Sequence, residues 1–132
     1  TKNIDFFSTV WAFQEAKVAR EAREEAERKR QEEQRRAEER RKRYNIEVEK
    51  TLALENMSED FETACKIRNL VKAVEEKGSS DTKVLQWISW AKAKADWYDP
   101  TVAADDEFFG TREHGKNKKD KTPEKVYFGF RF

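Results

Sequence analysis

Residues 20–43 read REAREEAERKRQEEQRRAEERRKR, and this stretch decides the fold class of the chain. Of its 24 residues 19 are charged, and the rest are glutamine or alanine, so nearly every residue is a strong helix former and none can anchor a core. The stretch predicts a solvated helix about 36 Å long, at about 1.5 Å per residue. Glutamates precede basic residues by four positions and predict ion pairs along it: Glu24/Arg28, Glu25/Lys29, Glu32/Arg36, Glu38/Lys42 and Glu39/Arg43.

Upstream of this stretch the chain becomes apolar. Residues 4–19 predict the amphipathic first turns of the same helix, which we expect to begin near Ser8 with Asp5 or Ser8 as the N-cap. Trp11 and Phe13 would be costly to leave in water, so this end should pack on an upstream domain, a second copy of the chain or the C-terminal aromatic residues. Alanines at a four-three spacing keep a coiled coil open as an alternative, but charged side chains between them favour a single helix.

Downstream, apolar residues return and predict that the long helix continues to Asn56. Ser58 is then expected to cap a second helix, whose acidic first turn suits the helix dipole. Gly78 is expected to end that helix in the left-handed conformation. The sequence therefore predicts a break in the helix between Asn56 and Ser58.

A third helix is predicted from Ser80 or Asp81 to the Asp99-Pro100 pair, which stops it. Its short connection to the second helix predicts an antiparallel pair, closed by the end of the long helix. Apolar residues cover more than half of its circumference. Trp87 and Trp90 are expected to lie in the core, with a binding face as the alternative reading of this tryptophan-rich helix.

After Pro100 the helical pattern ends. Phe108 and Phe109 are expected to tuck under the helical pair, while residues 115–125, rich in lysine and helix breakers, predict a mobile loop. Four aromatic residues among the last six should dock as an extended segment, on this chain or on a neighbour. The expected divisions are 1–56 for the long helix, 57–110 for the helical body, and 111–132 for the basic loop and aromatic tail.

The composition indicates the size of the core and the cellular environment of the chain. With 132 residues and 42% charged residues, the core should be small. The single cysteine, Cys65, allows no internal disulfide, and we expect a buried free thiol in a reducing, cytoplasmic environment. No apolar run is long enough to span a membrane, and no signal peptide is recognisable. The start without methionine suggests a fragment of a longer protein.

Motifs for chemistry are weak. Asp105, Asp106, Glu107 and His114 do not have a zinc-site spacing, and no phosphate loop, nucleophile elbow or cysteine-histidine pair is recognisable. We therefore predict no enzyme, no cofactor and no metal.

The basic runs are the better candidates for binding. They could contact nucleic-acid phosphates, although interspersed glutamates favour a solvated helix face. The residues concerned are Arg35, Arg36, Arg40, Arg41, Lys42 and Arg43 in the long helix, and Lys116, Lys118, Lys119 and Lys121 near the C-terminus.

The order of features resembles a known set of sequences. A charged alanine- and arginine-rich helix precedes ETACKIRNLVKAV at 62–74, LQWISWA at 85–91 and ADWYDP at 95–100. Over residues from about Phe13 to Gly110 this resembles the C-terminal region of a family of uncharacterised bacterial proteins. The resemblance implies a helical segment that follows an upstream domain, and it implies no biochemical activity.

Together these patterns predict an all-α chain: one very long charged helix, an antiparallel helical pair and an irregular C-terminal arm. The leading functional hypothesis is a non-catalytic interaction or spacer module of a larger bacterial protein, which binds an upstream domain or a second copy as a homodimer. The contact residues would be Trp11, Phe13, Trp87, Trp90 and Trp97. The alternative is a nucleic-acid-binding appendage that uses the basic residues.

Overall fold

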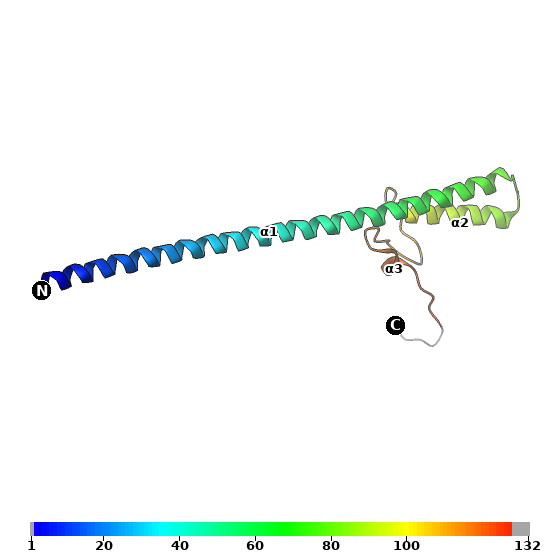
Figure 1. Cartoon of the computed structure of the whole chain (residues 1–132). Coiled ribbons are helices and arrows are strands. Elements are labelled where there is room, and N and C mark those ends of the chain that lie inside the picture. The colour runs from blue at the N-terminus through cyan, green and yellow to red at the C-terminus, as the bar shows by residue number, and fades with distance from the viewer. Residues whose placement is uncertain (1, 128–132) are drawn as a thin grey trace. The chain divides into compact units, whose positions relative to one another are not determined.

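The computed structural model of the chain describes residues 2–127, with side chains from residue 5 onward. It contains three helices, α1 (Lys2–Glu76), α2 (Thr82–Tyr98) and α3 (Lys118–Lys121), and the arm after α2 is otherwise irregular (Figure 1). The predicted fold class is confirmed: α2 packs beside the C-terminal part of α1. The tail at 128–132, whose aromatic residues we expect to dock, lies outside the described residues.

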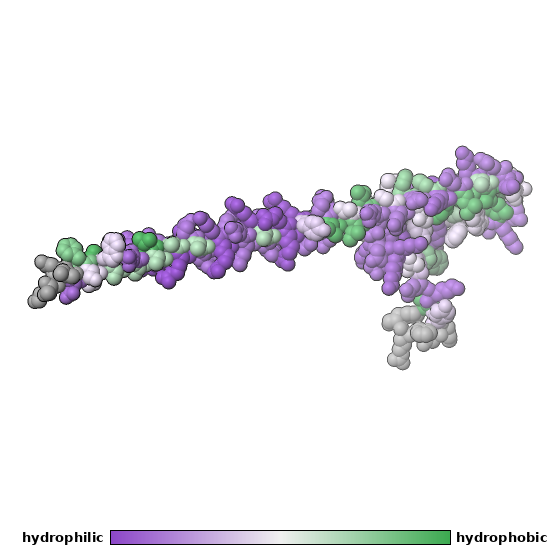
Figure 2. Space-filling model, viewed as in Figure 1, coloured by the Kyte–Doolittle hydropathy of each residue, from purple (hydrophilic) through white to green (hydrophobic). Residues whose placement is uncertain are grey.

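The chain divides into two compact units, residues 1–46 and 47–132. Unit 1 is a stretch of α1, and its described side chains are almost all exposed, as expected of a solvated helix; the hydrophilic colour dominates the charged part of α1 in Figure 2. Hydrogen bonding from Arg35, followed by that from Arg36, lowers the pKa of Glu32 to about 2. Ion pairs join neighbouring turns at Glu25–Arg28, Glu27–Arg30, Glu32–Arg35, Glu32–Arg36, Arg35–Glu39 and Glu38–Arg41.

Only one of the predicted ion pairs, Glu32–Arg36, is present among the described residues. The other four predicted pairs form no close ion pair in this described stretch, although Glu24 still attracts Arg28 and Lys29 still attracts Glu25 electrostatically. Most observed pairs join residues three apart rather than four, because helix positions three apart are neighbours too and the arginine side chain reaches either one. The helical character of the stretch is unaffected.

The predicted break near Asn56 is wrong, because α1 continues without interruption to Glu76. Ser58 does not cap a helix: its hydroxyl donates to the carbonyl of Leu54, 2.8 Å away, one turn earlier in the same helix. No glycine or proline occurs before Gly78, so nothing in the backbone requires a stop. The expected start near Ser8 is also wrong, since α1 already includes Lys2.

The end of α1 and both ends of α2 follow the prediction. Gly78 has a φ of +68°, and its amide donates to the carbonyl of Glu75 (3.0 Å). Asp81 caps α2 by accepting a hydrogen bond from the Lys83 amide (2.9 Å). Asp99 forms the C-cap. Short-range signals therefore place the turn between α1 and α2 correctly.

The interior of unit 2 is small. Its buried apolar side chains are Ala64 and Val71 from α1, and Ala91, Ala95 and Trp97 from α2. Alanines at the contact let the two helix backbones approach closely, but they bury little apolar area. Polar contacts must therefore also hold α1 and α2 together.

Several apolar residues are more exposed than predicted. Trp87 and Trp90 are 36% and 57% exposed, so their assignment to the core is wrong: α1 covers only the Ala91 and Ala95 side of α2. Cys65 is half-buried rather than fully buried. Phe108 is exposed, whereas Phe109 packs against Trp97 with ring centroids 5.3 Å apart.

The continuity of α1 can be tested at its predicted cap. Ser58→Ala should change the free energy of unfolding by less than about 0.5 kcal/mol, because alanine suits a helix interior. Asp81→Ala removes a true N-cap and should cost about 1 kcal/mol. Urea unfolding followed by circular dichroism compares the two variants. Equal losses would contradict an uninterrupted α1.

Candidate functional site

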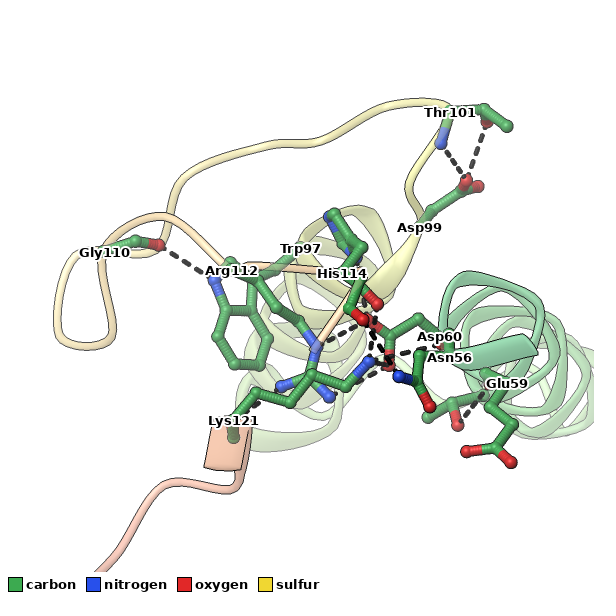
Figure 3. A network of polar contacts seen from close by, with 12 residues as sticks. Asn56, Glu59, Asp60, Trp97, Asp99, Thr101, Gly110, Arg112, His114 and Lys121 are labelled. Atoms are coloured by element: carbon green, nitrogen blue, oxygen red, sulfur yellow. Dashed lines mark hydrogen bonds and ion pairs between the residues drawn. The ribbon is translucent and has the colours of Figure 1, made fainter. Parts of the chain in front are cut away.

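One buried carboxylate joins the C-terminal arm to α1. Asp60 is 3% exposed, and Arg112 contacts both of its oxygens, Nε to Oδ2 at 2.8 Å and Nη2 to Oδ1 at 2.9 Å. His114 Nδ1 lies 2.8 Å from Oδ2, and Lys121 Nζ lies 3.1 Å from Oδ1. Figure 3 shows the three side chains converging on Asp60 from the arm. Together with Asn56, these residues are called the Asp60 cluster.

Further bonds from the Asp60 cluster hold the arm backbone. Lys121 Nζ also donates to the carbonyls of Asn56 (3.2 Å) and His114 (2.8 Å). Arg112 Nη1 donates to the Lys121 carbonyl (3.0 Å), and Asn56 Nδ2 donates to the carbonyl of Gly115 (2.9 Å). The segment expected to be a mobile loop therefore includes the short helix α3 and is fastened to α1. That prediction is wrong because the sequence gives no sign of the partners.

Burial by itself would raise the pKa of Asp60. Hydrogen bonds from Arg112, His114 and Lys121 outweigh that effect and hold the pKa below its ordinary value. These three neighbours therefore favour the ionised form of the Asp60 carboxylate. Its charge is what keeps Arg112 and Lys121 compensated inside the protein.

A layer of aromatic residues supports Arg112. Its guanidinium carbon lies 4.8 Å from the ring centre of Trp97 and 4.6 Å from that of Tyr98. The Trp97 indole donates to the carbonyl of Gly110 at 2.9 Å, as Figure 3 also shows. Trp97, predicted as a contact residue for a partner, is 3% exposed and belongs to the interior, so that prediction is wrong.

A second buried carboxylate ties α2 to α1. Asp99 accepts from Arg68 Nη1 (2.6 Å) and from the amide and hydroxyl of Thr101 (2.8 and 2.7 Å). Burial opposes ionisation of Asp99, but these bonds prevail and lower its pKa to about 2. Arg68 also contacts Asp96 at 3.0 Å. The bend after α2 is therefore fixed to α1 on the side facing Arg68.

The Asp60 cluster has limited chemical scope. The contact between Asp60 and His114 resembles two members of a catalytic triad, but within residues 5–127 no hydroxyl or thiol is hydrogen-bonded to this histidine. The described side chains form no group of three or more metal-ligating residues. Asp105 and Asp106 bind Thr111 and Lys94 instead. The contacts that the cluster does make hold the arm against α1.

Beside the buried interior lies an open apolar groove. It encloses about 290 Å³, and we define the apolar groove by Ile67 and Leu70 of α1, Trp87, Trp90 and Tyr98 of α2, and Phe109 of the arm. Ile67 and Leu70 are three residues apart, as are Trp87 and Trp90, and Tyr98 follows Trp90 by about two turns, so each helix contributes one face to the groove. Figure 2 shows hydrophobic surface spreading over this helical pair. Trp87 and Trp90 thus line the same groove, and their role in binding stays a prediction.

One charged residue borders the apolar groove. The Lys94 ammonium lies 4.3 Å from the ring centre of Phe109 and about 6 Å from those of Trp90 and Trp97. It also forms an ion pair with Asp106. That hydrogen bond, against the effect of burial, lowers the pKa of Asp106 with help from two backbone amides. The groove edge is consequently neutral as well as aromatic.

The other predicted contact residues lie in unit 1. Trp11 and Phe13 are 68% and 67% exposed, and the Trp11 indole donates to Glu15 Oε1 at 2.8 Å. Trp11 and Val18 line a shallow apolar hollow on this face of the helix. They are accessible, as a contact surface requires.

Half of the ten basic residues considered for nucleic-acid contact have acidic partners. Arg35, Arg36 and Arg41 are ion-paired with glutamates of the same helix, and Lys116 pairs with Glu113. Lys121 belongs to the Asp60 cluster with a side chain only 4% exposed, so its assignment as a phosphate contact is wrong. The described part of the chain shows no ion pair for the remaining members of the set, which are Arg40, Lys42, Arg43, Lys118 and Lys119. Nucleic-acid contact stays a prediction for them.

The Asp60 cluster was not predicted from the sequence. Asp60 was expected in the first turn of a separate helix, and no role was predicted for Arg112. One signal was available: Asp60 shares a helix face with Ala64 and Val71, so a carboxylate there faces inward and needs a partner. The identity of that partner, 52 residues away, has no local signature.

Comparison with known proteins gives no relative: no family model, curated protein or solved structure matches the chain. The resemblance to uncharacterised bacterial proteins therefore stays a prediction. Within the part of the chain that the structure describes, no helix has both the length and the apolar character to cross a membrane.

The Asp60 cluster predicts a large effect of a small change. Asp60→Asn leaves Arg112 and Lys121 buried without a counter-charge and should lower the free energy of unfolding by roughly 3–5 kcal/mol. The control is Glu62→Gln, which removes only an exposed pair with Lys66 and should change it by less than about 0.5 kcal/mol. Urea unfolding gives both values. Hydrogen exchange should also accelerate in residues 111–122 of the Asp60 variant, and equal effects of the two substitutions would contradict this role.

Asp99 predicts how stability responds to acid. Its pKa is lowered from 3.8 to about 2 on folding, so ionised Asp99 stabilises the native state above its unfolded-state pKa. This contribution should disappear as the pH falls from 4 to 2. In Asp99→Asn the free energy of unfolding should be lower at neutral pH and should fall less over this interval. Denaturant titrations at several pH values test this, and parallel curves for the two proteins would contradict it.

Proposed function

We propose that the chain is a non-catalytic helical interaction module, in which the apolar groove of unit 2 binds a partner and the charged helix of unit 1 acts as a spacer. The observation that carries the proposal is the exposure of Trp87 and Trp90 in a groove formed by α1, α2 and the arm. Scattered exposed apolar residues are ordinary, but a contiguous aromatic groove in an otherwise highly charged protein suggests a contact surface.

The surroundings of the apolar groove support this proposal. The Asp60 cluster fixes the arm, and Trp97 and Lys94 hold Phe109 at the groove edge. A prearranged groove loses less conformational entropy on binding than a flexible segment does. The residues that form the groove are apolar, which suits burial against another apolar surface rather than chemistry on a polar substrate.

Unit 1 supports the spacer role. Its charged stretch has no large apolar side chain, and its ion pairs stay within the helix, so it offers little to a tightly packed contact. The apolar residues near Trp11 would be a second contact region at the other end of this stretch. This separation of charged and apolar segments is what a spacer with binding surfaces requires.

A dye-binding measurement tests the proposal. At a concentration where sedimentation shows a monomer, the full chain should bind an apolar fluorescent dye, and Trp90→Glu should lose at least about half of the signal by placing a charge in the groove. Trp11→Glu, in unit 1, is the matched control and should keep the part of the dye signal that comes from the groove. A monomer that binds no dye, or a Trp90→Glu protein that binds as much as the parent, would overturn the proposal.

A further inference from the structure

We propose that the partner of the apolar groove is a second copy of the same groove, so that two helical pairs pack face to face around a two-fold axis. This inference rests on the proposed function, because it names the occupant of the same surface. Each copy would contribute α2 and the adjoining part of α1. The product would be a four-helix arrangement with Trp87 and Trp90 near its centre.

The small interior of unit 2 favours such a partner. Three of its five buried apolar side chains are alanines, and Val71 is the largest fully buried one. Two helices bury too little apolar surface to be very stable alone. A second helical pair would convert the exposed stripes of Leu70, Trp87 and Trp90 into core.

The exposed aromatic side chains supply about half of the smallest area that a stable interface buries. An aromatic side chain presents about 150–250 Å², so the exposed fractions of Trp87, Trp90 and Phe109 leave about 300 Å² of apolar surface per copy. Two copies would bury about 600 Å² from these residues alone, against about 1,200–2,000 Å² for a stable interface. Leu70, which is 56% exposed and also lines the groove, adds to this apolar area.

Charge decides between a second copy and a charged partner. In a two-fold contact every groove meets its own charge, so only a neutral groove can pair with itself without repulsion. The apolar groove meets this condition because Asp106 neutralises Lys94. On α1, one turn before Leu70, Lys66 pairs with Glu62. The one charged side chain of the groove lining is therefore compensated, which suits an identical neutral groove better than a strongly charged partner.

Sedimentation equilibrium of the full chain tests the dimer. Over rising protein concentration, at low and at moderate salt, the mass should double from 15.7 kDa, with little dependence on salt because the contact is apolar. Dye fluorescence should fall over the same concentration range as the groove is covered. Trp90→Glu should weaken dimerisation at least about 100-fold, since a symmetric interface carries the central substitution twice.

Trp11→Glu is the control and should dimerise like the parent. Trp90→Ala is a milder variant that should weaken dimerisation at least about 10-fold while keeping the helix. A dimer lost in Trp11→Glu and kept in Trp90→Glu would overturn the inference by placing the contact in unit 1. A chain that stays monomeric at high concentration but binds dye through Trp90 would overturn the dimer and leave the proposed function standing. A species that grows heavier only with a DNA duplex, and is sensitive to salt, would also overturn it.

Discussion

The ionised carboxylate of Asp60 is the constraint on which the rest of unit 2 depends. An unpaired charge in that position would be strongly destabilising. Arg112, His114 and Lys121 contact both oxygens of the Asp60 carboxylate and fill almost all of its hydrogen-bonding capacity. Because all three come from the arm, satisfying one charge on α1 fixes the path of the arm from Arg112 to Lys121. Arg112 then gives Trp97 a cation to stack on, and Trp97 positions Phe109. The position of Phe109 at the groove edge therefore depends on the polar contact between Asp60 and Arg112.

Polar contacts have this role because the apolar interior is small. Alanines bring α1 and α2 close together, and ion pairs at Arg68 and Glu75 set the register of the two helices. Apolar residues that a larger domain would bury are left on the surface instead. The tryptophans of α2 divide accordingly: Trp97 lies inside under the arm, while Trp87 and Trp90 face the groove.

What could be predicted from the sequence is what neighbouring residues determine. The helical fold, Gly78 at the turn, and Asp81 and Asp99 at the ends of α2 depend on backbone preferences and caps. The helix break predicted at Ser58 is absent. A serine in the middle of a helix can donate a hydrogen bond to the preceding turn, and in sequence such a serine looks the same as an N-cap. The prediction of a mobile loop in the arm was wrong for a different reason. Its lysines look solvated until Asp60 supplies a partner, and the groove tryptophans look buried until the path of α1 shows which side of α2 it covers.

The distance along the chain between Asp60 and its partners has a consequence for how the protein reaches its native state. Arg112 lies 52 residues and His114 lies 54 residues beyond Asp60, whereas the contacts between Arg68 and α2 close shorter loops of 28 and 31 residues. Closing a long loop has the larger entropic penalty, and its contacts form only after the intervening chain is ordered. On this ground we expect the helical pair to form before the arm docks. Docking of the arm would then remove water from the Asp60 carboxylate and complete the groove edge at Phe109.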